Sequence, residues 1–174
     1  VFGVLTILST FHYTKKFTHE KLALLTVFVL CSSIFFMQEF HLAVPNSYLI
    51  FFVSFGLFNF FDFYKNGKKL NWFLFYIAIG LGVLVKGPIA FALPGLIIFL
   101  FLLFKKDFNL RSILRINPFL GLLLSLLICA PWYYQAHILT NGAFTEGFFL
   151  QHNIERFSNE MEGHGGLPFV TWIF

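Results

Sequence analysis

One lysine stands apart from the other basic residues and lies directly before a pair that typically starts a helix. Lys86 precedes Gly87 and Pro88, at the beginning of an apolar stretch. Proline is favoured in the first turn of a helix, and the free amide groups of that turn, with the helix dipole, attract anions. Lys86 would therefore complete a phosphate-binding site. The alternative is an interfacial anchor whose ammonium reaches the lipid headgroups.

A second group of reactive side chains lies in the long hydrophilic segment at about residues 138–167. His152 and Arg156 are four residues apart, so a short amphipathic helix over 144–157 would place both on one stripe and its phenylalanines toward lipid. Such a stripe would offer a cation and an imidazole to a phosphate headgroup.

The same segment also allows a metal-binding interpretation. His152 and His164, together with a nearby acid such as Glu162, could hold a divalent metal ion, because imidazole and carboxylate form a plausible ligand set. The two histidines match no compact metal motif, so a metal requirement stays open. Glu39, in an earlier polar break, is a further candidate for acceptor or metal binding.

The distribution of the basic residues indicates a membrane topology. Ten of the twelve Lys and Arg residues fall in three short segments, whereas Lys86 and Arg156 lie elsewhere. Short cytoplasmic loops of membrane proteins are enriched in Lys and Arg. We therefore expect Lys86 and Arg156 on the outer face, and a cytoplasmic location for Lys15, Lys16, Lys21, Lys65, Lys68, Lys69, Lys105, Lys106, Arg111 and Arg115.

The composition independently favours a membrane protein. Hydrophobic residues make up 58% of the 174 residues and charged residues only 11%, with a mean hydropathy of +0.79. This leaves too little polar surface for a soluble domain. The net charge of +4 is explained by the topology, so no nucleic-acid partner is expected.

The apolar runs predict transmembrane helices rather than strands, because they are continuous and approach the ~20 residues that a helical span needs. A single span over 71–104 would place the second and third basic segments on opposite faces, so we divide it at Lys86, Gly87 and Pro88. The expected spans are 1–13, 21–37, 47–64, 71–85, 88–104 and 117–137, with a seventh starting near Pro168.

Several motifs, taken in order, resemble a known group of membrane enzymes. They are Gly80-Leu-Gly-Val-Leu-Val-Lys86-Gly87-Pro88, a helix ending in Lys105-Lys106-Asp107, Ala130-Pro131-Trp132-Tyr133, Phe148-Phe149-Leu-Gln-His152-Asn153-x-x-Arg156-Phe157 and His164-Gly165-Gly166-x-Pro168-Phe169. The series resembles the bacterial glycosyltransferases of the aminoarabinose lipid A transferase and protein O-mannosyltransferase-like group (glycosyltransferase family 39). These are integral-membrane enzymes of the GT-C fold. The resemblance covers most of the chain.

The resemblance implies transfer of a hexose or pentose from a polyprenyl-phosphate donor to a lipid, glycan or protein acceptor, as in lipid A modification or protein glycosylation. Lys86 corresponds to the family's lysine that would bind the donor phosphate. Arg156 and either His152 or His164 would complete the phosphate site or, in some members, a metal site. No other cofactor is implied.

Two departures from the family pattern concern acidic residues. The family's catalytic base is an acid in the first outer loop, which would lie upstream of Val1, so no catalytic base is assigned within this chain. Many relatives also have Asp where this chain has Asn46; either Glu39 supplies the compensating charge, or this branch does not need it.

The sequence therefore predicts an all-α, multi-pass transmembrane bundle of the GT-C type. We expect residues 1–174 to be one domain fragment of about six to seven helices that lacks the upstream catalytic loop and any C-terminal domain. The expected location is the bacterial inner membrane, with the active site facing the periplasm or exterior. The alternative functions are a polytopic transporter or flippase of lipid-linked substrates and a purely structural membrane subunit, which would leave the His- and Arg-bearing segment unexplained.

Overall fold

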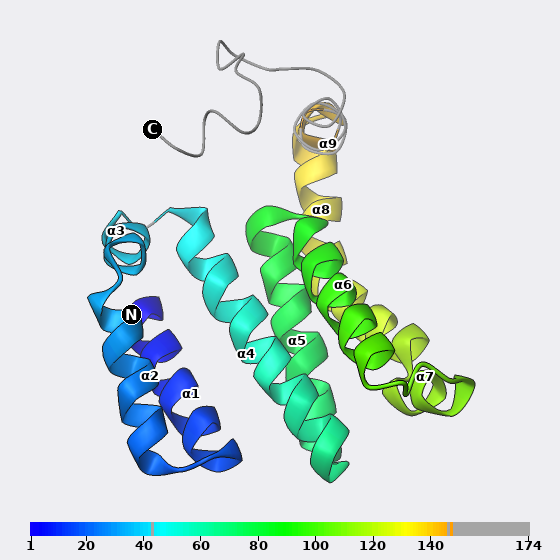
Figure 1. The fold of residues 1–174 in the computed structure, drawn as a ribbon. Coiled ribbons are helices and arrows are strands. Elements are labelled where there is room, and N and C mark those ends of the chain that lie inside the picture. Colours follow the sequence, from blue (N-terminus) through cyan, green and yellow to red (C-terminus); the bar gives the residue numbers. More distant parts are fainter. Residues whose placement is uncertain (43, 146, 148–174) are drawn as a thin grey trace, which may run out of the picture. The chain divides into compact units, whose positions relative to one another are not determined.

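The computed structural model describes residues 1–42, 44–145 and 147, and the regular secondary structure in these residues is helical (Figure 1). The prediction of an all-α fold is confirmed. The helices are α1 Phe2–Phe17, α2 Glu20–Ser32, α3 Ile34–His41, α4 Pro45–Asn66, α5 Lys69–Lys86, α6 Ile89–Phe104, α7 Leu110–Ile116, α8 Pro118–Leu139 and the short α9 Ala143–Thr145.

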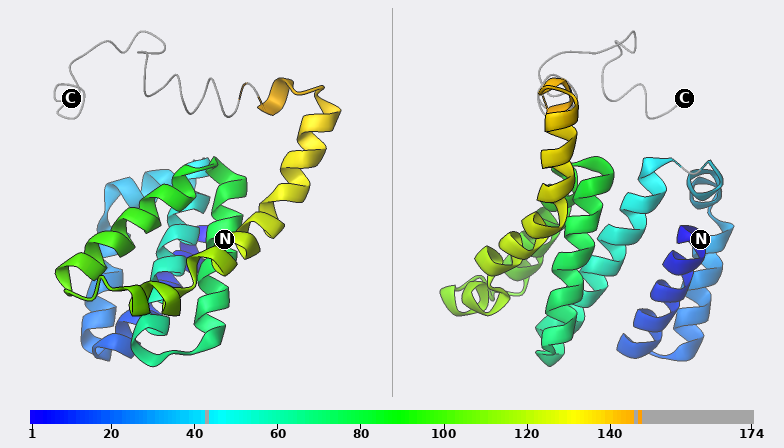
Figure 2. Two further views of the ribbon diagram at one scale, coloured as in Figure 1. Left: turned by 90° about the vertical axis from the view of Figure 1, so that its right-hand side faces the viewer. Right: turned by 180° about the vertical axis from the view of Figure 1, so that it is seen from behind.

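The chain divides into two compact units, Val1–Cys129 and Ala130–Phe174. Within the first unit, the α1–α2 turn, the α4–α5 turn and the α6–α7 connection lie at one end of the helices (Figures 1 and 2). These connections and the helix ends beside them carry the ten grouped cations. The α5–α6 junction, α3 and the start of α4 lie at the opposite end. Lys86 is therefore separated from the other described Lys and Arg residues by the length of the helices.

The core of the first unit forms where α4 packs along α5. Phe60 and Phe75 are buried there with ring centroids 5.5 Å apart. The two helices pack closely at Gly56, where a Cβ would be in ordinary contact with the Phe75 and Ile79 side chains, 3.5 Å from each. This packing fixes the start of α4 relative to the end of α5, which is where the candidate site lies.

The expected span at 21–37 is interrupted in the structure. Helices α2 and α3 are bent by 67° at a break between Ser32 and Ile34. Ser33 adopts an extended conformation there, and its hydroxyl accepts a hydrogen bond from the Phe36 amide at 3.4 Å. Serine is a favoured N-cap residue because its side chain satisfies an amide that the helix leaves free. The cap thus starts α3 inside an apolar run.

The third basic segment contains a short helix that the sequence analysis did not predict. The Asn109 side chain caps α7 by accepting a hydrogen bond from the Ser112 amide at 2.9 Å. The helix ends at Ile116, and the next residue, Asn117, has a φ of 49°, a left-handed conformation that asparagine tolerates better than most residues. Arg115 therefore lies in the last turn of a helix rather than in a loop.

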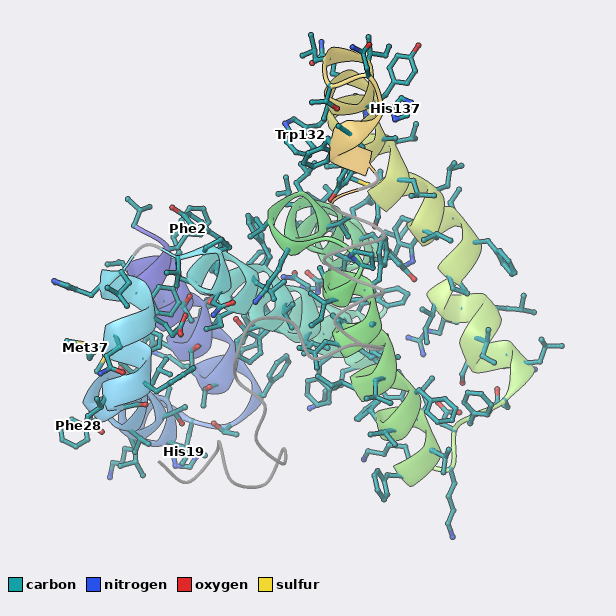
Figure 3. The ribbon with its side chains drawn as sticks, turned by 90° about the horizontal axis from the view of Figure 1, so that it is seen from above. Phe2, His19, Phe28, Met37, Trp132 and His137 are labelled. Atoms are coloured by element: carbon teal, nitrogen blue, oxygen red, sulfur yellow. The ribbon has the colours of Figure 1, made fainter. Side chains whose placement is uncertain are left out.

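Among the described residues, three helical stretches are long and apolar enough to cross a membrane: Pro45–Asn66, Lys69–Lys86 and Leu110–Leu139. The bent pair α2 and α3 would make a fourth, and α6 is a shorter apolar helix. Large apolar side chains also point outward, such as Phe28 and Met37, which are 71% and 59% exposed (Figure 3). Apolar surface of this kind is suited to lipid, so the chain is a multi-pass membrane protein.

In the second unit, the described residues comprise the end of α8, a turn and α9. The Phe144 amide donates to the Thr140 hydroxyl at 3.0 Å, and the turn between them contains Gly142 with φ 88°. The Trp132 and Phe144 rings meet edge to face, with centroids 5.3 Å apart.

Candidate functional site

Lys86 occupies the last turn of α5, directly before the start of α6. Its side chain is half-buried. The predicted division of residues 71–104 into two helices at this point is confirmed. A cation at the C-terminal end of a helix interacts favourably with the helix dipole.

Gly87 gives the junction its geometry. Its φ of 72° and ψ of −149° lie in a region that is essentially accessible only to glycine. The Gly87 amide donates to the Val83 carbonyl at 2.7 Å, and its own carbonyl accepts from the Ala90 amide at 3.1 Å. Pro88 follows with φ −58°, which suits the entry to a helix. The junction therefore holds Lys86 between the end of one helix and the start of the next.

The Lys86 ammonium donates a hydrogen bond to the side-chain oxygen of Asn46, forty residues earlier in the chain. Asn46 lies in the first turn of α4, where Pro45 starts the helix. An ammonium has three donors, so this contact orients Lys86 and leaves donors for a ligand. The two residues that the sequence analysis singled out separately thus form one site.

The charge of Lys86 is not neutralised by a described acid. Among residues 1–42, 44–145 and 147, ion pairs join Lys15 to Glu20 and Lys16 to Asp62, and no carboxylate pairs with Lys86. The amino ends of α4 and α6 lie at this same end of the unit (Figure 1). A lysine near the amino ends of two helices is an arrangement suited to an anion such as a phosphate.

Glu39 lies in α3, which packs against α4. Its Oε2 is buried and has no hydrogen-bond partner within the part of the chain that the structure describes. Leaving a buried polar atom unsatisfied costs about 1–3 kcal/mol. This carboxylate is therefore a candidate to receive a hydrogen bond from an acceptor molecule. The described residues contain no group of three or more His, Cys, Asp or Glu suited to a metal ion.

The remaining predicted site residues lie outside the described residues. They are His152, Arg156, Glu162 and His164. Their roles in phosphate or metal binding stay predictions.

The sequence analysis did not identify a buried polar cluster between α1, α4 and α5. Asp62 is only 1% exposed and accepts hydrogen bonds from Lys16, Asn66 and Asn71. One turn away, Tyr13 donates to Asn59 at 2.8 Å. The sequence pattern that could have revealed this cluster is the spacing of Asn59, Asp62 and Asn66, which places them on one face of an apolar helix. Polar side chains on one face of such a helix indicate a polar helix interface. The cluster joins three helices at the basic end.

Comparison with known proteins indicates the family. The family model described as dolichyl-phosphate-mannose-protein mannosyltransferase matches residues 1–134. An uncharacterised protein of Aquifex aeolicus is 28% identical over 155 residues, which are 88% of this chain and 30% of that protein. No solved structure matches.

Two further relatives bear the name undecaprenyl phosphate-alpha-4-amino-4-deoxy-L-arabinose arabinosyl transferase. The Pseudomonas paraeruginosa protein is 31% identical over 100 residues, covering 58% of this chain and 18% of the relative. The Aeromonas hydrophila protein is 30% identical over 108 residues, which cover 62% of this chain and 19% of that relative. The chain thus spans less than a third of the length of these relatives.

Proposed function

This chain belongs to the dolichyl-phosphate-mannose-protein mannosyltransferase family, and from that premise we propose that the complete protein is a membrane glycosyltransferase using a polyprenyl-phosphate sugar. The proposed acceptor is a lipid, glycan or protein at the outer face of the inner membrane. The names of the Pseudomonas and Aeromonas relatives support an undecaprenyl-phosphate-linked donor.

The observation that carries the proposal is the Lys86 ammonium, which is held by Asn46 and has no carboxylate partner among the described residues. Its end of the unit is opposite the ten grouped cations, so it would face away from the cytoplasm under the topology expected from charge. An interfacial anchor would need only a flexible lysine. A lysine held by a specific acceptor and followed by a glycine-only backbone conformation fits a positioned ligand better.

In the proposed reaction, an acceptor oxygen or nitrogen attacks the anomeric carbon of the donor sugar, with inversion. The bond between that carbon and the phosphate oxygen breaks, and the bonding electrons leave with polyprenyl phosphate. A base supplied by another part of the protein takes the acceptor's proton. Lys86 binds the phosphate and stabilises the negative charge that develops on it, which is electrostatic stabilisation of a leaving group.

The remaining candidates have proposed supporting roles. Arg156 and His152 complete the donor-phosphate site, and Glu39, Glu162 and His164 contribute to acceptor or metal binding.

Transfer of radiolabelled sugar from polyprenyl phosphate tests the proposal in membranes containing the full-length protein. We compare wild type with Lys86→Ala and Arg156→Ala at matched expression. Lys105→Ala, at the basic end, is the matched control. Removing one group that stabilises a developing anion typically costs about 100-fold to 1,000-fold in rate.

We expect losses of that order for Lys86→Ala and Arg156→Ala, and a near wild-type rate for the control. Unchanged transfer in both variants would overturn their assignment to the donor phosphate. Absence of transfer by the wild type with every tested polyprenyl donor would instead favour a transporter of lipid-linked substrates.

A further inference from the structure

A second candidate site lies at the basic end of the first unit, away from Lys86. A cavity of about 540 Å³ opens between the α4–α5 turn, α5 and the α7–α8 junction. Two cations, Lys69 and Arg115, line it together with the aromatic side chains of Trp72 and Phe73. Positive charge beside apolar surface suits a ligand that is itself anionic at one end and apolar at the other.

An apolar groove continues from this cavity. It has a volume of about 300 Å³ and shares Trp72, Phe73 and Leu120 with the cavity. The groove then follows α8 past Leu123 and Leu127, which are 53% and 64% exposed. Charge at the end of a groove that runs along apolar helices matches the distribution of polar and apolar groups in a membrane lipid.

The two cations have no carboxylate partner in the described part of the chain, where the ion pairs involve other lysines. The nearby Asp107 carboxylate is used differently, because it accepts hydrogen bonds from Tyr64 at 2.7 Å and Asn109 at 2.9 Å. The hydrogen bond from Tyr64 is the main cause that holds the pKa of Asp107 below its usual range. The Arg115 charge also contributes to lowering the pKa of Asp107, but neither Lys69 nor Arg115 forms an ion pair with a described carboxylate, so both can contact an external anion.

The walls of the cavity are held in place. The Trp72 indole nitrogen donates to the Ile116 carbonyl at 2.6 Å, so this ring is fixed and is 8% exposed. The Arg115 guanidinium lies over the Phe63 ring, 5.7 Å from its centroid. The guanidinium also lies beside Gly67, where a Cβ would be 3.4 Å from an Arg115 nitrogen. Trp72 and Arg115 are thus positioned before a ligand binds, which reduces the entropy lost by these two side chains on binding.

We propose that this cavity and groove bind an anionic glycerophospholipid from the leaflet at the basic end. Its headgroup phosphate contacts Lys69 and Arg115, and one acyl chain lies along Leu120, Leu123 and Leu127. Basic pockets between membrane helices are suited to anionic headgroups. The site is separate from the proposed transfer site and does not depend on the sugar reaction.

Native mass spectrometry of the purified full-length protein tests this proposal. We titrate it with phosphatidylglycerol, phosphatidylcholine and undecaprenyl phosphate. The variants are Lys69→Gln with Arg115→Gln, and Leu123→Trp, which fills the groove without changing charge. Lys105→Gln with Lys106→Gln is the control, because it removes two cations from the same end outside the cavity.

We expect wild type and control to bind phosphatidylglycerol more tightly than phosphatidylcholine. Each cation near the membrane surface contributes about fivefold to the affinity for an anionic lipid. The Lys69 and Arg115 double variant should therefore bind phosphatidylglycerol about 25-fold more weakly. Leu123→Trp should also weaken binding, with the charge intact. Circular dichroism and size-exclusion chromatography verify that each variant is folded.

An equal loss of phosphatidylglycerol binding in the Lys105 and Lys106 control would mean that general surface charge causes the binding, and would overturn the proposed site. Preference for undecaprenyl phosphate over phosphatidylglycerol would overturn the assignment of the occupant. Unchanged binding in Leu123→Trp would overturn the role of the groove.

Discussion

At the scale of single residues, Asn46 orients Lys86 by accepting a hydrogen bond from its ammonium. An aspartate at this position would form an ion pair and neutralise the ammonium, whereas the asparagine oxygen orients it and leaves its charge. A charged lysine that is already positioned can bind a phosphate without first losing a carboxylate partner. Asn46 is therefore a positioning residue for the proposed donor site.

Substitutions at Asn46 should separate the effect of orienting the Lys86 ammonium from the effect of its charge. Asn46→Ala removes the acceptor, so we expect kcat/KM for the donor to fall about tenfold, as for loss of one hydrogen bond to a charged group. Asn46→Asp keeps an acceptor oxygen but neutralises Lys86, so kcat should stay near wild type while the donor KM rises. Steady-state transfer kinetics with the purified full-length protein measure kcat and the donor KM for both variants. Wild-type values in Asn46→Ala would contradict a positioning role for Asn46.

The sequence identified Lys86 and Asn46 but not their contact. They are separated by forty residues and meet only because α4 packs along α5. The Asp62 cluster shows the same limit, since Lys16 and Asn71 reach Asp62 from other helices. Residue types predict which groups need a partner, whereas the packing of helices determines which partner each one finds.

At the scale of helices, α5 and α8 make a close contact through a glycine. A Cβ built at Gly121 would lie 2.0 Å from the Tyr76 ring. Nearby, the Ser125 hydroxyl donates to the Tyr76 carbonyl at 2.8 Å. Tyr76 is 6% exposed, so its ring has little room to move. The contact holds α8 against the helix that ends in Lys86.

Gly121→Ala should therefore destabilise the protein. Overpacking of this kind typically costs about 1–3 kcal/mol. Gly95→Ala in α6 is the matched control, because a Cβ there meets nothing within 4 Å, and alanine favours a helix over glycine by about 1 kcal/mol. Thermal or denaturant unfolding of the two purified variants measures the difference. Equal stability would contradict the close packing.

The helices themselves were largely predictable from hydrophobic runs and from local chemistry at their ends. The Lys86, Gly87 and Pro88 sequence correctly separated α5 from α6. The bend at Ser33 and helix α7 were not predicted, because a single cap residue in an apolar or basic stretch is a weak signal until its hydrogen bond is seen.

At the scale of the whole molecule, the separation of charge between the two ends should determine orientation. The ten grouped cations lie at one end of the first unit and Lys86 at the other. Because cytoplasmic loops are enriched in Lys and Arg, the insertion of the chain should place Lys86 outside. This orientation is a premise of the proposed reaction at the outer face.

Cysteine labelling in intact cells tests the orientation of the first unit in the membrane. The full-length protein used for it carries Cys31→Ser and Cys129→Ala, so that these two thiols do not react. Lys68→Cys places a thiol at the basic end, and Leu42→Cys places one at the opposite end, where the native side chain is 70% exposed. A membrane-impermeant maleimide should label position 42 directly and position 68 only after permeabilisation. The reverse pattern would put Lys86 on the cytoplasmic side and exclude an outer-face donor site. Labelling of both in intact cells would contradict their separation by a membrane.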